Sequence, residues 1–218
     1  MIADGRGYAA ARPRPVLRDD LKLCHYDLLS GVSPLILIAA KTKAGERSIK
    51  LTELFLEELD REGPLTRRVL EKIPEGRNDW KPHAKSMPLG RLAALVAGMP
   101  SWLAMMVDKN EFDLNPPGGS SGSFQTNFRT NAELLKTMED GVGAARAALQ
   151  KTNDDHLMTP WRLLVAGKTV AEHPRHVMMR DSINHLAHHR GQLTVYLRMN
   201  DLPVPAVYGP SADDQRFS

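Results

Sequence analysis

The sequence has little of several things that mark specialised proteins. It holds one cysteine, Cys24, in 218 residues. A single cysteine excludes an internal disulfide framework and fits a reducing compartment. The most apolar run, SPLILIAA at residues 33–40, is much shorter than the roughly 20 residues that span a bilayer. A positively charged start followed by an apolar core, typical of secretory signals, is also missing. We therefore expect a soluble cytoplasmic protein with no membrane partner.

Positive and negative charges are also nearly balanced. The formal net charge is +3, and no block of like charges or basic stripe accompanies it, so we expect no nucleic-acid partner. Hydrophobic residues make up 42% and charged residues 25% of the chain, which is ordinary for a globular domain. The length fits one domain, or one domain with an extension.

The first part of the chain differs in pattern from the rest. Residues 1–46 mix glycine, proline, arginine and alanine, with neither a helical nor a strand period. They predict a poorly ordered N-terminal extension, and residues 47–218 predict the folded domain. No methionine lies between Met1 and Met87, which is unfavourable to a start site downstream of Met1.

Apolar residues recur at helical spacing in four segments, at residues 48–75, 86–107, 130–151 and 174–200. Ser48 and Ser86 are candidate N-caps for the first two. Thr130 and Glu133 have the spacing of a capping box at the third. Because no regular series of strands accompanies them, these helices predict an all-α fold, a four-helix bundle.

Three features interrupt these helices. Pro64 and Pro100 each remove a helical hydrogen bond and predict kinks. Glu62 breaks the apolar face of the first helix. We expect it to reach solvent beside the kink, and a buried functional carboxylate is the alternative. Residues 108–128 predict a long loop, and residues 162–174 a short extended or hairpin-like connection around Gly167.

Histidines concentrate in the last helix, in NHLAHHRGQL at residues 184–193. His185 and His189 are four residues apart, so their rings share one face, where two imidazoles can bind one divalent metal. Such spacing is also common among surface histidines and hydrogen-bonded core histidines. The general-base glutamate of zinc proteases is missing, since Leu186 stands in its place, and His188 points away from the pair.

The run HLAHHRGQL, followed by YLR and VPAVYG, resembles the last helix and tail of the DinB-like (DinB/YfiT) superfamily of four-helix-bundle metalloproteins. The similarity extends upstream through PHAKSMPLGRLAALVAGMPSW and covers roughly residues 49–213. The resemblance implies one zinc or nickel-like ion held by three histidines. Two of them match His185 and His189.

The third ligand of that pattern falls on the second helix, at Leu95 in this sequence, and leucine has no lone pair to donate. One ligand is worth on the order of 3 kcal/mol, or about two decades of affinity. We therefore expect His185 and His189 to face the interior near Leu95 and to bind zinc or nickel weakly. A substitute ligand, Glu62 or His83, would restore tight binding.

Two functions remain open. The resemblance implies a metal-dependent enzyme, similar to thiol transferases or hydrolases, that acts on a small-molecule thiol or an anionic substrate. Arg190 and Arg198 are candidates to steer such an anion, although a surface charge or a salt bridge within the bundle is the more common role for each. The alternative is a non-catalytic dimeric bundle with a decayed site, acting as a binding or scaffold protein. Relatives resemble dimers, so we expect a homodimer in either case.

Overall fold

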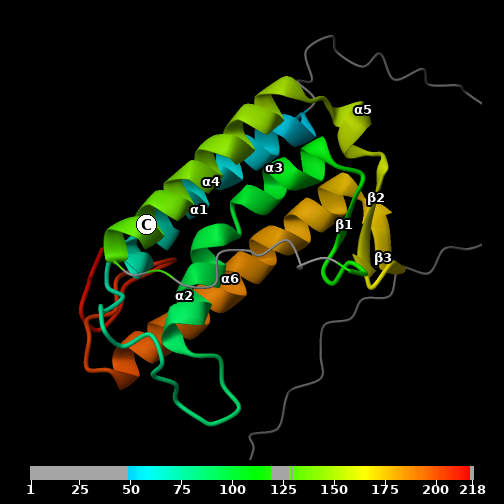
Figure 1. Cartoon of the computed structure of the whole chain (residues 1–218). Coiled ribbons are helices and arrows are strands. Elements are labelled where there is room, and N and C mark those ends of the chain that lie inside the picture. The colour runs from blue at the N-terminus through cyan, green and yellow to red at the C-terminus, as the bar shows by residue number, and fades with distance from the viewer. Residues whose placement is uncertain (1–48, 119–127, 129, 217–218) are drawn as a thin grey trace, which may run out of the picture. The chain divides into compact units, whose positions relative to one another are not determined.

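The computed structural model describes residues 49–118, 128 and 130–216 of the chain. The predicted extension, residues 1–46, and the candidate cap Ser48 lie outside these residues. The described part forms six helices and one three-stranded sheet (Figure 1). The fold is therefore mostly helical, as predicted, but the all-α expectation was wrong in leaving out the sheet.

Helix α1 spans Leu51–Leu70 and receives its N-terminal cap from a distant part of the chain. The backbone N–H groups of Leu51 and Thr52 donate to the carboxylate of Asp154, at 2.9 and 3.2 Å. Asp154 begins the short helix α5, Asp154–Leu157. Since the first N–H groups of a helix have no partner within it, this carboxylate both satisfies two of them and joins α5 to the start of α1.

The second predicted helix is two helices in the structure, α2 at Leu89–Gly98 and α3 at Ser101–Asp108, bent by 48° at Met99 and Pro100. Pro88, not Ser86, is the residue before α2, and no side chain caps it. Among the described residues no single helix is long and apolar enough to cross a membrane, and only the bent pair α2 and α3 together reaches that length and apolarity.

Helix α4, Asn131–Lys151, begins where the capping pattern predicts. Thr130 precedes it in extended conformation, and its hydroxyl accepts a hydrogen bond from the Glu133 N–H at 3.2 Å. Helix α6, Arg175–Met199, matches the predicted bounds within one residue at each end. These two helices and α1 are the longest elements, and they set the length of the helical part (Figure 1).

The sheet has the strand order β1-β2-β3, with β1 at Glu111–Asp113, β2 at Pro160–Val165 and β3 at Lys168–Pro174. Strand β1 pairs parallel to β2, and β2 pairs antiparallel to β3. The hairpin formed by β2 and β3 confirms the prediction around Gly167. Strand β1 was missed, because it is three residues long inside the segment that we predicted as a loop.

The turn of this hairpin shows why it forms there. Ala166 and Gly167 both have positive φ, 51° and 78°, as a two-residue turn that follows the twist of the strands requires. The Asp113 carboxylate of β1 accepts hydrogen bonds from both of their N–H groups, at 3.0 and 2.7 Å. Strand β1 is thereby held to the tip of the hairpin as well as along its edge.

The apolar faces of the helices enclose two adjoining clusters of buried side chains. Helix α4 packs on α1, α2 and α3, and α6 packs on α1, α2 and α3 from another side. One cluster lies around α2, α4 and the C-terminal part of α6, and the other lies beneath the sheet around α3, α4 and the N-terminal part of α6. The sheet therefore covers only one end of the helices (Figure 1).

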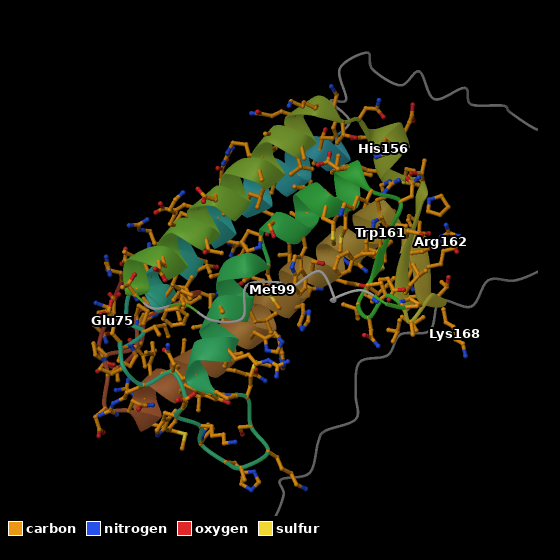
Figure 2. All side chains as sticks on the ribbon, viewed as in Figure 1. Glu75, Met99, His156, Trp161, Arg162 and Lys168 are labelled. Carbon is orange, nitrogen blue, oxygen red and sulfur yellow. The ribbon has the colours of Figure 1, made fainter. Side chains whose placement is uncertain are left out.

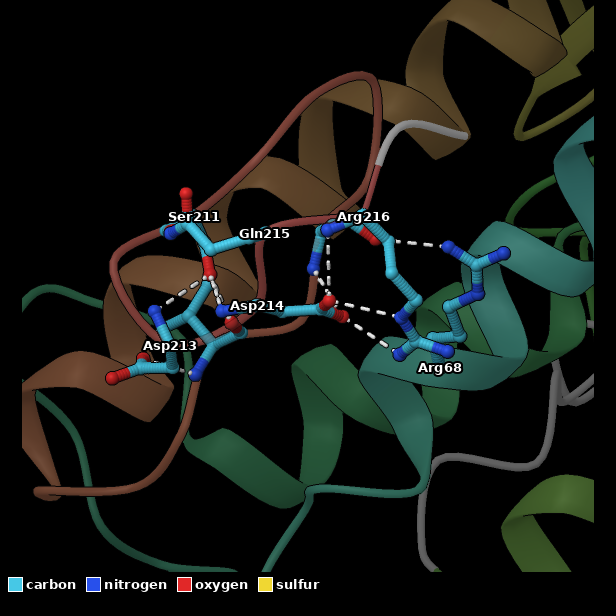
Figure 3. Close-up of polar contacts among 8 residues, drawn as sticks. Arg68, Ser211, Asp213, Asp214, Gln215 and Arg216 are labelled. Carbon is cyan, nitrogen blue, oxygen red and sulfur yellow. Dashed lines mark hydrogen bonds and ion pairs between the residues drawn. The ribbon is translucent and has the colours of Figure 1, made fainter.

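The segment after α6 folds back along α1 instead of leaving the domain. Arg68 of α1 donates to the Ala206 carbonyl at 3.3 Å. The Asp214 carboxylate accepts from the Ala206 N–H at 3.1 Å and from the Arg216 guanidinium at 2.7 Å, and Ser211 accepts from the Asp213 and Asp214 N–H groups (Figure 3). These bonds fix the tail against α1 near residue 208.

Candidate functional site

The two histidines predicted as metal ligands meet on α6. The Nε2 atoms of His185 and His189 lie 2.8 Å apart, and their ring centroids are 4.5 Å apart. The helical spacing therefore aligns the rings as predicted. The expectation that both face the interior was wrong, because His185 is exposed and His189 is half-buried. The pair lies at the edge of the helical core, open to solvent.

A hydrogen-bonded chain orients this pair. The Gln192 amide oxygen accepts from Nδ1 of His189 at 2.7 Å, and the Gln192 amide nitrogen donates to Nε2 of His188 at 3.0 Å. With its proton on Nδ1, His189 presents a lone pair at Nε2, which accepts the proton that His185 carries on its own Nε2. An outer partner of this kind fixes the tautomer of a metal-ligating histidine. Gln192 is thus a positioning residue that the sequence reasoning missed, although it stands one turn from His189.

The surroundings of His185 keep its ring neutral. Although the residue as a whole is exposed, partial desolvation of its ring lowers the pKa of His185 below its ordinary value of 6.5, and the neighbouring His189 and His188 lower it further. Trp102 of α3 lies beside it, with ring centroids 5.9 Å apart. A neutral imidazole is the form that binds metals or exchanges a proton in a hydrogen bond. The His185 ring is therefore uncharged at neutral pH.

The described residues supply no third protein ligand. Leu95 is half-buried on α2 and packs against the core cluster that includes Leu186 and Leu193 of α6. Within the described residues, no group of three or more histidine, cysteine, aspartate or glutamate side chains could hold a metal ion. His83 is exposed, and its Nδ1 accepts from the Lys85 N–H at 3.1 Å. The pair is thus left with two donor atoms.

The other candidate substitute, Glu62, is committed elsewhere. It is 5% exposed, so the expectation that it reaches solvent was wrong, and its Oε2 accepts from Arg190 at 2.6 Å. Arg190, only 1% exposed, also donates to the Tyr208 hydroxyl at 2.5 Å and to the Thr66 hydroxyl at 3.0 Å. The Tyr208 hydroxyl in turn donates to Glu62 at 2.9 Å. We call Glu62, Thr66 and Arg190 the buried ionic cluster; Tyr208 of the tail, 55% exposed, covers it from outside.

The two arginines considered for anion steering both form ion pairs. Arg190 belongs to the buried ionic cluster. Arg198 pairs with Asp213 of the tail at 2.5 Å, and this pair is exposed to solvent. The Asp213 carboxylate already balances the charge of Arg198, and its hydrogen bond raises the pKa of the Arg198 guanidinium. The salt-bridge interpretation of both residues is confirmed, and neither faces His185 as a free cation.

Three further histidines of the described residues lie apart from the pair. His156 is in α5, and its Nε2 contacts the Val107 carbonyl at 2.9 Å. His173 is on β3, and it is exposed. His176 is half-buried on the first turns of α6. Nine residues of helix separate it from His185, and this separation prevents a common site.

A pocket of about 240 Å³ opens beside His185. It lies between α3, α6 and the sheet, and Trp161 of β2 lines it (Figure 2). Three aromatic side chains, three methionines and two leucines form most of its wall, together with Asp181, Ser182 and His185 of α6. Among the residues that the structure describes, no arginine or lysine is part of the wall. The sequence reasoning did not find this pocket, because its wall combines β1, α3, β2 and α6, and β1 was not predicted.

Two solved structures resemble this chain in fold. A DinB-like protein from Bacillus cereus ATCC 10987 superposes with a TM-score of 0.54 at 24% sequence identity, over 71% of this chain and 95% of that one. A DinB-like protein from Bacillus subtilis superposes with a TM-score of 0.51 at 16% identity, over 75% of this chain and 99% of that one. At these identities the likeness extends to the fold alone.

Comparison of sequences gives the family. No curated protein matches the chain significantly. The model of the DinB family matches residues 47–216, which is most of the chain and includes α1, α6 and the tail. The histidine pair, the residue at the expected third position and the folded-back tail all lie within this match. The chain therefore belongs to the DinB family.

Proposed function

We propose that this DinB-family protein is a small-molecule-binding protein whose His185–His189 pair holds a divalent ion weakly, beside the apolar pocket. The observation that carries the proposal is the pair itself: two Nε2 atoms face each other at 2.8 Å, with Leu95 at the position where the family pattern has a third histidine. The pair keeps its orientation through Gln192, and the pocket opens directly next to it.

The donor set fits zinc or nickel in type but not in number. Neutral imidazole suits both ions. Two imidazole nitrogens bound to one tetrahedral zinc lie about 3.3 Å apart, so the rings need to move apart by only a few tenths of an ångström. The Nε2 proton of His185 would move to Nδ1. With two protein ligands in place of three, affinity should fall by about two decades, since one ligand is worth on the order of 3 kcal/mol.

A metal-dependent enzyme, similar to thiol transferases or hydrolases, is the second candidate. It is favoured by the exposure of His185, which leaves coordination positions open to a small molecule. Catalytic zinc sites keep such a position open, but they hold the ion with three protein ligands. A soft donor brought by the small molecule, such as a thiolate, would supply the third ligand. Two donors alone do not support a catalytic step, so the binding function stands first.

Zinc titration tests the proposal. Wild-type protein and Leu95→His should be titrated by calorimetry at neutral pH, after dialysis without a strong chelator. Wild-type protein should bind weakly. Leu95→His should bind about a hundredfold more tightly, because it adds one ligand worth on the order of 3 kcal/mol. The added imidazole also replaces a packed leucine, so the metal-free variant should unfold at a lower urea concentration than wild type.

Two variants serve as controls. In wild-type protein, His189→Ala leaves a single donor and should abolish zinc binding. In the Leu95→His background it leaves two donors and should return the affinity to the weak value of wild type. His83→Ala removes an exposed histidine outside the pair and should leave the zinc isotherm unchanged. Tight binding by wild-type protein would show that a further residue completes the site. An unchanged affinity in Leu95→His would show that residue 95 does not face the pair, and the metal proposal would then fail.

A further inference from the structure

The wall of the pocket beside His185 is polar on one side only. Its three polar members, Asp181, Ser182 and His185, all come from residues 181–185 of α6. The other members are apolar and come from α3, from β1 and the residue after it, from β2 and from the preceding turn of α6. A ligand in the pocket therefore meets apolar side chains everywhere except at residues 181–185.

Hydrogen bonds at both ends of β1 keep this wall in place. At one end the buried Arg175 of α6 donates to the carbonyl groups of Met106, at 2.7 Å, and Lys109, at 2.5 Å. At the other end the Asp113 carboxylate accepts from the N–H groups of the hairpin turn. The strand between these anchors brings Phe112 into the wall. The pocket is therefore preformed, and ligand binding requires little rearrangement of the chain.

The volume of the pocket limits the size of a ligand. It is about 240 Å³, whereas an apolar protein cavity of about 150 Å³ holds one benzene ring. One ring leaves part of the space empty, two fused rings fill it, and three exceed it. The aromatic members of the wall, Trp102, Phe112 and Trp161, offer contacts to a flat ring system. The methionines adapt to its outline.

Charge beside the pocket favours neither cations nor anions. Asp181 pairs with Arg180 at 3.7 Å, and both side chains are more than half exposed. The polar side of the pocket thus carries both signs and is open to solvent. It tolerates a polar group on the ligand, because that group stays hydrated there. A polar group placed against α3 or the strands would lose its hydration without gaining a partner.

We propose that this pocket binds an aromatic compound of two fused rings whose polar substituent lies on one side only, against residues 181–185 of α6. The inference rests on the proposed small-molecule-binding function and names its ligand class. It requires no metal ion, because the apolar contacts hold the ring system.

Three alcohols test the size of the ligand on the full chain. Phenylmethanol, 2-naphthylmethanol and 2-anthrylmethanol carry the same polar group on one, two and three rings. Calorimetry should give the naphthyl compound about tenfold higher affinity than the phenyl compound, because the second ring buries more apolar surface. The anthryl compound should bind more weakly than the naphthyl compound, by about tenfold or more. Affinity that rises with each added ring would indicate non-specific apolar binding and would overturn the proposal, as would no binding of any of the three.

A fourth probe tests the one-sided placement of the polar group. Naphthalene-2,6-dimethanol adds a second hydroxymethyl group at the opposite end of the same two rings. It should bind about tenfold more weakly than 2-naphthylmethanol, because one of its hydroxyl groups faces the apolar part of the wall. Equal affinities would contradict the proposed orientation.

Two variants test the place of binding. Met178→Trp, on α6 in the pocket wall, should fill the pocket and reduce the affinity for 2-naphthylmethanol about tenfold or more. Val195→Trp introduces the same side chain on the same helix, at a residue that is 56% exposed and outside the wall, and it should leave the affinity unchanged. An equal loss in both variants would mean that the probe binds elsewhere.

A measurement on the unchanged chain guards against misfolding of these variants. With ¹³C-methyl-labelled methionine, 2-naphthylmethanol should shift the methyl signals of Met105, Met106 and Met178. The signal of Met138, buried in the other core cluster, should stay in place. Shifts confined to methionines outside the pocket would refute the assignment. Zinc titration of the same samples separates this inference from the metal proposal, since either can fail while the other holds.

Discussion

Replacing Arg190 with methionine should destabilise the protein far more than the same change at the exposed Arg198 of α6. The guanidinium is 1% exposed and donates to Glu62, Thr66 and Tyr208. Methionine fills much of the same volume but leaves the Glu62 carboxylate buried with only the Tyr208 hydroxyl to neutralise it. Breaking a buried ion pair in this way costs about 3–5 kcal/mol. In a protein of this size each kcal/mol lowers the melting temperature by about 2–4 °C.

Urea unfolding followed by circular dichroism at 222 nm measures this cost. Arg198→Met is the matched control, since Arg198 is on the same helix and also pairs with a carboxylate, that of Asp213, but its side chain is 51% exposed. Exposed pairs are worth at most about 1 kcal/mol, so the two variants should differ by at least 2 kcal/mol.

The double variant Glu62→Leu with Arg190→Met separates the pair from its individual charges. It removes both charges at once, and a buried pair replaced by apolar residues of similar volume is often neutral in stability. We expect the double variant to be more stable than Arg190→Met alone. If Arg190→Met costs no more than Arg198→Met, water reaches the Glu62 carboxylate and our account of the buried ionic cluster is wrong.

Four further results are expected. Zinc affinity should fall as pH drops, because protons compete for the ring nitrogens, and the lowered pKa of His185 delays its protonation to a pH below the ordinary 6.5; an affinity that is unchanged on acidification well below that value would contradict this. The pKa of Asp154 is lowered, chiefly by its bond from the Leu51 N–H, so the stabilising charge is present above the ordinary value of 3.8 and lost as pH falls through the lowered pKa. The stability difference between wild type and Asp154→Asn should therefore shrink below that pH in urea titrations. Gly90→Ala should cost about 1–3 kcal/mol, because its Cβ would lie 2.8 Å from that of Asn78; Gly98→Ala, with open space around it, should cost nothing. Sedimentation should show a homodimer, and a single species of the chain mass would refute that expectation.

The sequence predicted the helical part of the fold well and the sheet poorly, for physical reasons. Helix α4 was predictable because Thr130 and Glu133 are a local signal for its first turn. The start of α1 was not, because its cap is Asp154, about a hundred residues away. Strand β1 is held by pairing with β2 and by Asp113 bonds to the hairpin turn. Neither contact can be recognised from the three residues of β1 alone.

The candidate site was likewise predictable only in its local features. The four-residue spacing of His185 and His189 is local, and it correctly predicted two facing rings. Their exposure depends on how α6 is rotated against α2 and α3, which periodicity gives only to within part of a turn. Glu62 was misjudged because its partner, Arg190, lies 128 residues away in sequence. A carboxylate on an apolar face is buried only when such a partner exists.

The buried ionic cluster gives the histidine pair a support that no metal has to provide. Arg190 follows His189 directly, and consecutive side chains on a helix point about 100° apart. Because the buried ionic cluster holds Arg190 in one direction, it also sets the direction of His189. The tail adds a second fastening through Tyr208. We therefore expect the two rings to keep their orientation whether or not an ion is present. Leucine and histidine codons differ by as little as one nucleotide, so a complete triad lies one point mutation away from a fold that already holds the other two members in place.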